Sequence, residues 1–180
     1  MRLFFGLSLP GDLRAVTRAC AEAAAPLVPG RYALPENHHV TLAFLGEVPP
    51  GRVGDAGDVL KRCAASFPAP MLTLDGFDCF GRRANGILIL RVRSEPPLAP
   101  LHERLVEALA AAGLPADPGP FSPHITLARH AVLPDALPAC PSASFRAAQA
   151  HVFLSARDAA GVLRYTPLTT VSFAPANAGI

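Results

Sequence analysis

The chain has 180 residues, 51% of them hydrophobic, and a formal net charge of +2. This length and apolar content suit one domain or two small lobes that share a core. No apolar stretch approaches the roughly 20 residues that a membrane-spanning helix needs, and the weak positive charge excludes a strong electrostatic footprint for duplex nucleic acid. Four cysteines without a C-x-x-C pair indicate neither a zinc site nor a disulfide framework, so we expect a reduced, cytoplasmic protein without a membrane partner.

The N-terminal half of the chain is predicted to alternate between strands and helices. Alternating apolar residues favour a strand over Leu3–Leu9, and apolar residues at helical spacing predict a helix over Asp12–Ala25. A loop or short strand over 31–38 leads into a strand over His39–Leu45, which glycine and proline residues end. A second helix is predicted over Arg52–Ser66.

The C-terminal half contains a hairpin, one further helix and three more strands. A polar turn that holds Arg82 and Arg83 joins the two strands of the hairpin. The helix over Pro97–Ala112 has a continuous apolar stripe and a glycine just past its end. The hairpin strands are expected over Met71–Phe80 and Gly86–Arg93, and the later strands over Phe121–Arg129, His151–Arg157 and Thr169–Ala174.

Two nearly identical tetrapeptides are the most informative feature of the sequence: His39-Val40-Thr41-Leu42 and His124-Ile125-Thr126-Leu127. Alternate side chains of a strand point to opposite faces, so the histidine and threonine of each motif share one face while the β-branched residue and leucine face the core. A single His-x-Thr would most simply be a polar pair beside a core. Two copies, each followed by leucine and each preceded by a proline, favour a functional role.

One motif lies in each half of the chain, which suggests two related lobes. The predicted fold class is α+β, with two pseudo-symmetric αβ lobes whose antiparallel sheets line a central cleft and whose helices lie outside. We expect the two lobes to be intertwined in a single domain over residues 1–180.

The paired motifs offer two proton-transfer groups and two hydroxyl donors to one small anion, and the family that they resemble implies that this anion is a cyclic phosphodiester. An acid and a base must act on opposite sides of the phosphorus, and imidazole serves both roles because its pKa is about 6.5. The hydroxyls of Thr41 and Thr126 are placed to donate to the non-bridging oxygens. Arg129 is a further candidate phosphate ligand, because a guanidinium matches phosphate geometry. This chemistry needs neither a metal nor another cofactor.

The same residues resemble the two-histidine (2H) phosphoesterase superfamily, and within it the bacterial and archaeal RNA 2′,3′-cyclic phosphodiesterases, historically called 2′-5′ RNA ligases. The similarity runs almost from end to end. It is carried by Arg2–Phe5 with Leu9-Pro10, by Pro35–Leu42 followed by Phe44-Leu45-Gly46, by Pro120–Arg129, and by Tyr165 followed by Pro167-Leu168.

The resemblance implies that His39 is the proton donor to the departing 3′ oxygen, that His124 is the proton acceptor from water, and that the product is a 2′-phosphate. Sequence cannot orient the substrate, so the two labels can be exchanged. The substrates expected are RNA with 2′,3′-cyclic phosphate ends, tRNA fragments included, or small cyclic nucleotides, and the protein is expected to be a monomer. Run backwards, the reaction gives weak 2′-5′ ligation without ATP. Lys61, the only lysine, lacks the K-x-D-G context of an ATP-dependent ligase.

Three aromatic side chains flank the motifs and are candidates for stacking on a base: Phe44, Phe121 and Tyr32. Each is equally consistent with core or wall packing, and relatives often carry tryptophan at the position of Tyr32. Histidines outside the motif positions are expected to be structural or surface residues, namely His38, which should face away from His39, and His102, His130 and His151.

Three alternative functions remain open at this level. A non-catalytic module that binds RNA ends or nucleotides would not need both an acid and a base. A metallohydrolase could use histidines with Asp117, although the chain lacks H-E-x-x-H and clustered carboxylates. A two-histidine enzyme could also act on ADP-ribose cyclic phosphate or on a 2′-5′ oligonucleotide linkage.

Overall fold

The computed structural model describes residues 1–117 and 119–175. In the first half of the chain the elements are β1 Arg2–Ser8, α1 Gly11–Ala24, β2 Arg31–Tyr32, the short 3₁₀ helix η1 Pro35–Asn37, β3 His39–Glu47, the 3₁₀ helix η2 Pro50–Arg52 and α2 Val53–Ala64. In the second half they are β4 Met71–Arg82, β5 Asn85–Glu95, α3 Ala99–Ala111, β6 His124–Ala131, β7 Ser144–Arg146, β8 Gln149–Arg157 and β9 Leu163–Ser172.

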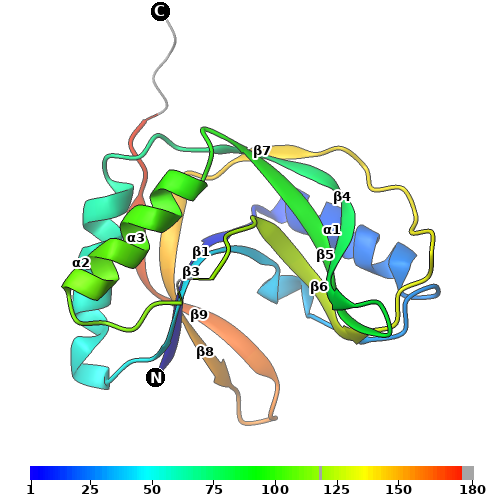
Figure 1. Cartoon of the computed structure of the whole chain (residues 1–180), viewed down its shortest axis with the longest axis horizontal. Helices are drawn as coiled ribbons and strands as arrows, with labels where there is room; N and C mark the ends of the chain where they lie inside the picture. The colour runs from blue at the N-terminus through cyan, green and yellow to red at the C-terminus, as the bar shows by residue number, and fades with distance from the viewer. Residues whose placement is uncertain (118, 176–180) are drawn as a thin grey trace, which may run out of the picture.

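The strands form one curled antiparallel sheet with two distinct halves (Figure 1). Its order is β7-β4-β5-β6-β3-β1-β8-β9, and the short β2 pairs with β6. Helices α2 and α3 pack beside the half that contains β3, β8 and β9, whereas α1 packs behind β6. The halves meet between β3 and β6, where the register places Val40 opposite Ile125. The predicted α+β class with antiparallel sheets and outer helices is therefore confirmed.

The two halves of the sheet are interleaved in sequence. Strand β1 pairs with β3 and β8, while the helix that follows it, α1, crosses to the other half. The pairing of the N-terminal β1 with the C-terminal β8 ties distant segments into one half. Each half thus contains segments from both ends of the chain, so neither corresponds to one half of the sequence. That residues 1–180 form one domain stays a prediction.

The core lies under both motif strands. The β-branched residues and leucines of the motifs, Val40, Leu42, Ile125 and Leu127, have no exposed surface. They pack in one hydrophobic cluster with residues of the three long helices, as the alternation predicts. Burying these side chains fixes which face of each strand is left for the histidine and threonine, because a slip of one residue would turn the apolar set outward.

Two strands differ from the sequence-based expectation. Strand β9 begins at Leu163 instead of Thr169, because Pro167 interrupts the apolar pattern there but is tolerated in an edge strand. Strand β7 was not predicted, since three residues after a proline-rich loop carry little periodicity. Its pairing with β4 holds it in place. Within the described residues no helix is long and apolar enough to cross a membrane.

Candidate active site

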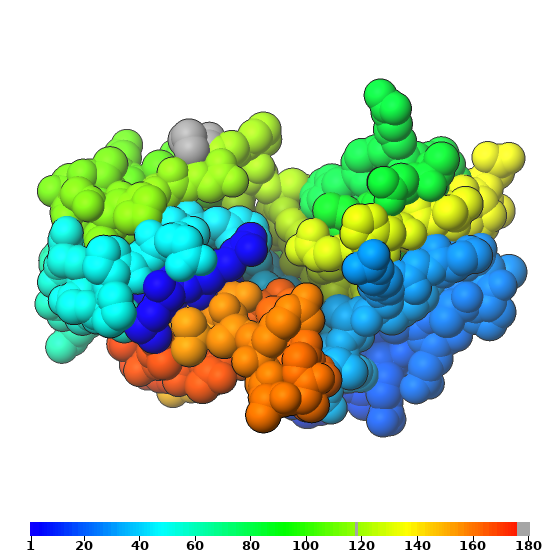
Figure 2. Space-filling model, turned by 90° about the horizontal axis from the view of Figure 1, so that it is seen from below, coloured from blue at the N-terminus to red at the C-terminus, as the bar shows by residue number. Residues whose placement is uncertain are grey.

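Strands β3 and β6 bring the two motifs side by side at the groove between the halves, which is visible from below in Figure 2. The two motifs run in opposite directions, because β3 and β6 pair in antiparallel fashion at Val40 and Ile125. The histidine of one strand therefore lies beside the threonine of the other. Both histidines are only partly accessible, and the residue that follows each of them, Val40 or Ile125, is buried. The predicted pairing of the two motifs across one groove is therefore seen in the fold.

Hydrogen bonds fix the tautomer of His39. Its Nδ1 lies 2.7 Å from the carbonyl oxygen of Asn37, and a carbonyl only accepts, so Nδ1 carries the proton. The other nitrogen, Nε2, lies 3.0 Å from Oγ1 of Thr41. In the neutral ring this nitrogen has a free lone pair, to which the threonine hydroxyl donates. The proton that His39 gains or loses is therefore held at Nε2.

His124 is oriented in the same way. Its Nδ1–H donates to the carbonyl oxygen of Ser122 at 2.7 Å, again two residues before the histidine. This leaves Nε2 as the nitrogen that exchanges protons. The equivalent bond in both motifs gives the two imidazoles the same tautomer and leaves Nε2 of each ring as the nitrogen that can gain or lose a proton.

Aromatic rings surround His39. The ring of Phe4 lies 4.8 Å from its ring and that of Tyr165 lies 4.9 Å away, edge-on, with Phe153 behind Phe4. Burial is the main reason that the pKa of His39 falls from 6.5 to about 4, and repulsion from His124 and other nearby positive charge lowers it further. His39 is therefore neutral at pH 7 in the free protein.

His124 has a similar but more open environment. Phe80 packs edge-on against its ring at 4.7 Å. Burial lowers the pKa of His124 below its usual value, and the charge of Arg129 adds to this effect. The same guanidinium adds to the lowering of the pKa of His39 by burial, and it offsets part of the rise that burial causes in the pKa of Tyr165. Arg129 thus acts electrostatically on both halves of the groove.

A β-bulge brings Arg129 onto the face of His124, although an odd number of positions separates them. In a regular strand such a separation places two side chains on opposite faces. The pairing of β6 with β5 slips by one residue at Leu127, which is the extra residue of the bulge. Leu127 and Ala128 are consequently both buried, and the alternation restarts with Arg129 exposed.

Strand β3 has the same irregularity at the equivalent place. Its pairing with β1 slips at Leu42, so Leu42 and Ala43 are both buried and Phe44 follows, 44% exposed. Phe44 therefore holds in β3 the position that Arg129 holds in β6, on the same face as His39. It is the candidate base-stacking ring that the fold leaves most available.

The other two candidate aromatic residues are more occupied. Phe121 stacks on His102, with ring centroids 4.4 Å apart. Tyr32 packs against the core and its hydroxyl donates to the carbonyl of Val28, and burial raises its pKa. Contact of either ring with a base stays a prediction, as do the roles of the motif residues.

The remaining histidines have structural contacts. His38 is 2% exposed, and its Nδ1–H donates to Thr17, whose own hydroxyl donates to a helix carbonyl. His151 is bonded to Ser8 and Thr170. His130 is at the surface, beside Asn85, and His102 donates to the carbonyl of Leu42.

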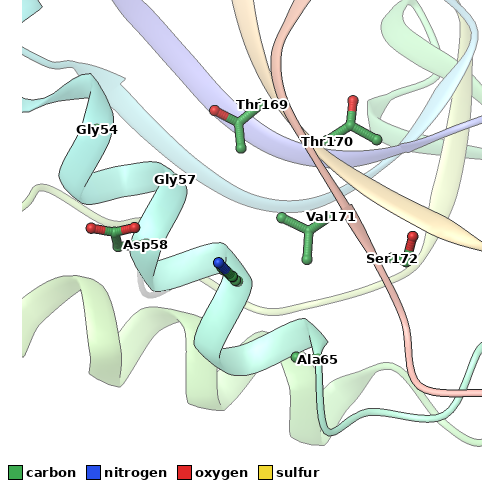
Figure 3. A pocket seen from close by; sticks show the side chains of 9 residues that line it. Gly54, Gly57, Asp58, Ala65, Thr169, Thr170, Val171 and Ser172 are labelled. Atoms are coloured by element: carbon green, nitrogen blue, oxygen red, sulfur yellow. The ribbon is translucent and has the colours of Figure 1, made fainter.

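Two residues weighed for other chemistries have other contacts, and the amide of Asp117 donates to the carbonyl of Phe44 at 3.0 Å. Lys61 lines a groove of about 520 Å³ between α2 and β9, together with Gly57, Asp58 and Thr169 (Figure 3). Asp117 accepts a hydrogen bond from the amide of Gly119 within its own loop. Across residues 1–117 and 119–175 no group of three or more histidine, cysteine, aspartate or glutamate side chains is placed to hold a metal ion.

Sequence reasoning missed several residues that shape the site. Phe4, Phe80 and Phe153 pack on or near the motif histidines, and Asn37 both accepts from His39 and donates its side-chain amide to the carbonyl of Leu163. The position of Asn37 two residues before His39 was the available signal. The aromatic residues gave none, since their contacts come from separate strands.

Comparisons with known proteins identify the family of the chain. The family model of the 2′-5′ RNA ligase superfamily matches residues 9–159. The RNA 2′,3′-cyclic phosphodiesterase of Escherichia coli K12 is 32% identical over 169 residues, which are 93% of each protein. The enzyme of the same name from Geobacillus stearothermophilus is 35% identical over 148 residues, 78% of this chain. The chain spans about half (47%) of the length of that second relative.

Solved structures show the same fold. The Escherichia coli protein LigT in complex with 3′-AMP has a TM-score of 0.81 at 30% identity, over 96% of this chain and 97% of LigT. The protein TT0787 of Thermus thermophilus has a TM-score of 0.79 at 26% identity, over 97% and 99% of the two chains. The resemblance seen in the motifs is thereby confirmed, and the chain belongs to the 2′-5′ RNA ligase superfamily.

Proposed function

We propose that this protein hydrolyses RNA 2′,3′-cyclic phosphate ends to 2′-phosphates by acid–base catalysis with two histidines and no metal. The observation that carries the proposal is the matched pair of imidazoles. Both are fixed as the Nδ1–H tautomer, and in both Nε2 is the nitrogen that can exchange a proton. The charge of Arg129 contributes to the lowered pKa of each. Relatives named RNA 2′,3′-cyclic phosphodiesterase support the same reaction class.

In the proposed reaction, His124 Nε2 takes a proton from water while the water oxygen forms a bond to phosphorus. The bond from phosphorus to the 3′ oxygen breaks, and the proton on His39 Nε2 passes to that oxygen. Thr41, Thr126 and Arg129 donate to the non-bridging oxygens, on which negative charge accumulates. Exchanging the roles of the two histidines would give a 3′-phosphate instead.

Because the pKa of His39 is low, its role as proton donor depends on the bound substrate. A proton donor must be protonated, yet at a pKa of about 4 the ring is neutral at pH 7. A phosphate anion beside Nε2 favours the charged ring and raises the pKa. We therefore propose that the negative charge of the substrate brings in the proton that His39 later donates, so that the acid forms only in the complex.

Ligation follows from the same displacement at phosphorus when an alcohol takes the place of water. A 5′-hydroxyl that replaces water would be deprotonated by His124 and would attack the cyclic phosphate, giving a 2′-5′ linkage without ATP. We propose this as a weak activity of the same site, carried out by a monomer on RNA ends.

The test is incubation of the protein in EDTA with a short RNA that ends in a 2′,3′-cyclic phosphate. Formation of a 2′-phosphate by the wild type, and its loss in both His39→Ala and His124→Ala, would support the proposal. His130→Gln, at an exposed histidine of the same strand, is the control. Activity that disappears with EDTA and returns with a divalent cation would refute metal independence, and a 3′-phosphate product would exchange the roles of the histidines.

A further inference from the structure

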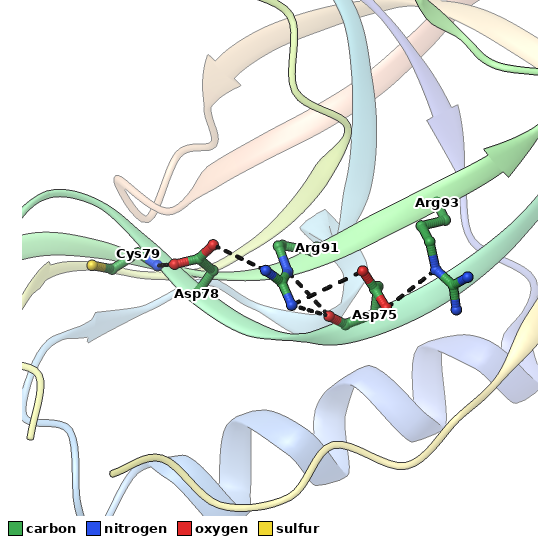
Figure 4. A network of polar contacts seen from close by, with 5 residues as sticks. All are labelled: Asp75, Asp78, Cys79, Arg91 and Arg93. Atoms are coloured by element: carbon green, nitrogen blue, oxygen red, sulfur yellow. Dashed lines mark hydrogen bonds and ion pairs between the residues drawn. The ribbon is translucent and has the colours of Figure 1, made fainter. Parts of the chain in front are cut away.

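Arg91 lies beside His124 on the same face of the sheet. The register of β5 and β6 places the two residues directly opposite each other, and opposite residues of an antiparallel pair share a face. On the next strand, Asp75 and Asp78 approach the Arg91 guanidinium from β4 (Figure 4). Arg91 is therefore the nearest arginine in β5 to the paired histidines, on the side of His124 that lies away from His39.

The backbone of β4 holds this guanidinium in one orientation. Nε–H and Nη2–H of Arg91 both donate to the carbonyl oxygen of Asp75, at 3.1 and 3.0 Å. That carbonyl is available because the pairing of β4 with β5 is irregular between Leu74 and Phe77, where Gly76 has a φ of +86°. Only glycine adopts such a conformation readily.

The rest of the guanidinium is not used by the fold. Its ion pairs with Asp75 and Asp78 span 3.9 and 3.7 Å, beyond hydrogen-bond length, and the Arg91 side chain is 51% exposed. Exposed pairs of this kind stabilise a protein little. Within the described residues the remaining N–H groups of Arg91 make no hydrogen bond, so one donor edge of an oriented guanidinium is left unused on the strand that pairs with the strand of His124.

We propose that Arg91 forms a subsite for an RNA phosphodiester next to the reactive phosphorus, so that the substrate is an RNA strand and not a mononucleotide. This inference rests on the proposed function and deepens it. A guanidinium matches phosphate in geometry and charge, and one that is already oriented loses less freedom on binding. The phosphodiester belongs either to the strand that carries the cyclic end or, in ligation, to the strand whose 5′-hydroxyl attacks.

The experiment compares kcat/KM for adenosine 2′,3′-cyclic phosphate and for a trinucleotide with the same cyclic end. One charge-assisted contact at a half-exposed site corresponds to about tenfold. R91Q should therefore lose about tenfold on the trinucleotide and less than about twofold on the mononucleotide. R93Q is the matched control. Arg93 lies on β5 like Arg91 and forms an ion pair with the same Asp75, but it is two residues farther along the strand from the position opposite His124 and pairs with Thr73.

A comparison of hydrolysis with ligation identifies which RNA strand carries the phosphodiester that Arg91 binds. If R91Q leaves hydrolysis of both substrates unchanged but weakens ligation of a 5′-hydroxyl trinucleotide, the phosphodiester belongs to the attacking strand. Equal losses on mononucleotide and trinucleotide would overturn the inference, because Arg91 would then act on the reaction centre itself. No change in hydrolysis or ligation would also overturn it and leave Arg91 a surface ion pair.

Binding separates this inference from the proposed function. Anisotropy of a 5′-fluorescein trinucleotide that ends in a 2′-phosphate does not require turnover. R91Q should bind it about tenfold more weakly and reduce the slope of log affinity against log salt by about 0.7, the value for one single-strand phosphate contact. If the wild type fails to hydrolyse RNA but this difference persists, the proposed function fails and the subsite stands. Unchanged affinity and slope, together with unchanged ligation of the 5′-hydroxyl trinucleotide, would remove the subsite.

Discussion

Binding of a tetrahedral anion in the groove should bring a proton onto His39. The perturbation is the addition of sulfate, which resembles a phosphate group but does not titrate between pH 4 and 8. Any proton taken up on binding must then come to the protein. We expect His39 to account for about one of these protons, because its Nδ1–H is held by the Asn37 carbonyl and its Nε2, beside the Thr41 hydroxyl, is the nitrogen left to take up a proton.

The size of the effect follows from the pKa of His39, which burial lowers to about 4. At pH 7 about one molecule in a thousand carries the proton, and placing it there costs about 4 kcal/mol. A bound anion raises the pKa, so the complex holds more protons than the free protein. Sulfate affinity therefore increases as pH falls, by about tenfold per pH unit from the pKa of the complex down to pH 4.

Calorimetry at pH 6 in buffers of different ionisation enthalpy counts these protons directly. His124 also has a lowered pKa and can contribute, so the decisive comparison is with His39→Gln. This variant should take up about one proton fewer than the wild type and should lose one unit of the slope of log affinity against pH. Equal proton uptake in the two proteins would refute the assignment of His39 as the group that the substrate protonates.

Three further predictions follow from the same contacts. His39→Ala and His124→Ala should each lower turnover by about 10²–10⁴-fold, with a double variant far from additive because acid and base act together; near-wild-type turnover of either single variant would contradict its role. Arg129→Gln removes a positive charge, so the pKa of both motif histidines should rise, as NMR titration of the imidazole carbons would report; unchanged values would show that this guanidinium is too distant to matter. Burial lowers the pKa of His38 to about 4, below its value in the unfolded chain, so its contribution to stability is complete above pH 6.5 and is lost as pH falls towards 4, by about 3 kcal/mol. Urea unfolding of His38→Gln should show a pH dependence weaker by that amount, and an unchanged dependence would place the acid sensitivity elsewhere.

Local sequence patterns are sufficient to predict the helices and strands that carry the motifs. The three long helices and the motif strands were predicted within a few residues of their observed ends, because apolar periodicity and glycine or proline stops are local properties. The pairing of the two His-x-Thr sets across one groove also followed, since a repeated motif on two buried strands has few other uses. Where a proline interrupts the pattern, as in β9, local reasoning placed the strand too late.

The sequence by itself thus determined which residue types are available for the chemistry and which face of each motif strand they occupy. Only the tertiary structure decided that bulges after Leu42 and Leu127 turn Phe44 and Arg129 towards the groove, because a bulge depends on the partner strand. It also decided that Phe4, Phe80 and Tyr165 enclose the histidines and that Arg91 stands beside His124. These contacts join segments far apart in the chain, and their physical cause is sheet pairing and burial, which no single stretch of sequence contains.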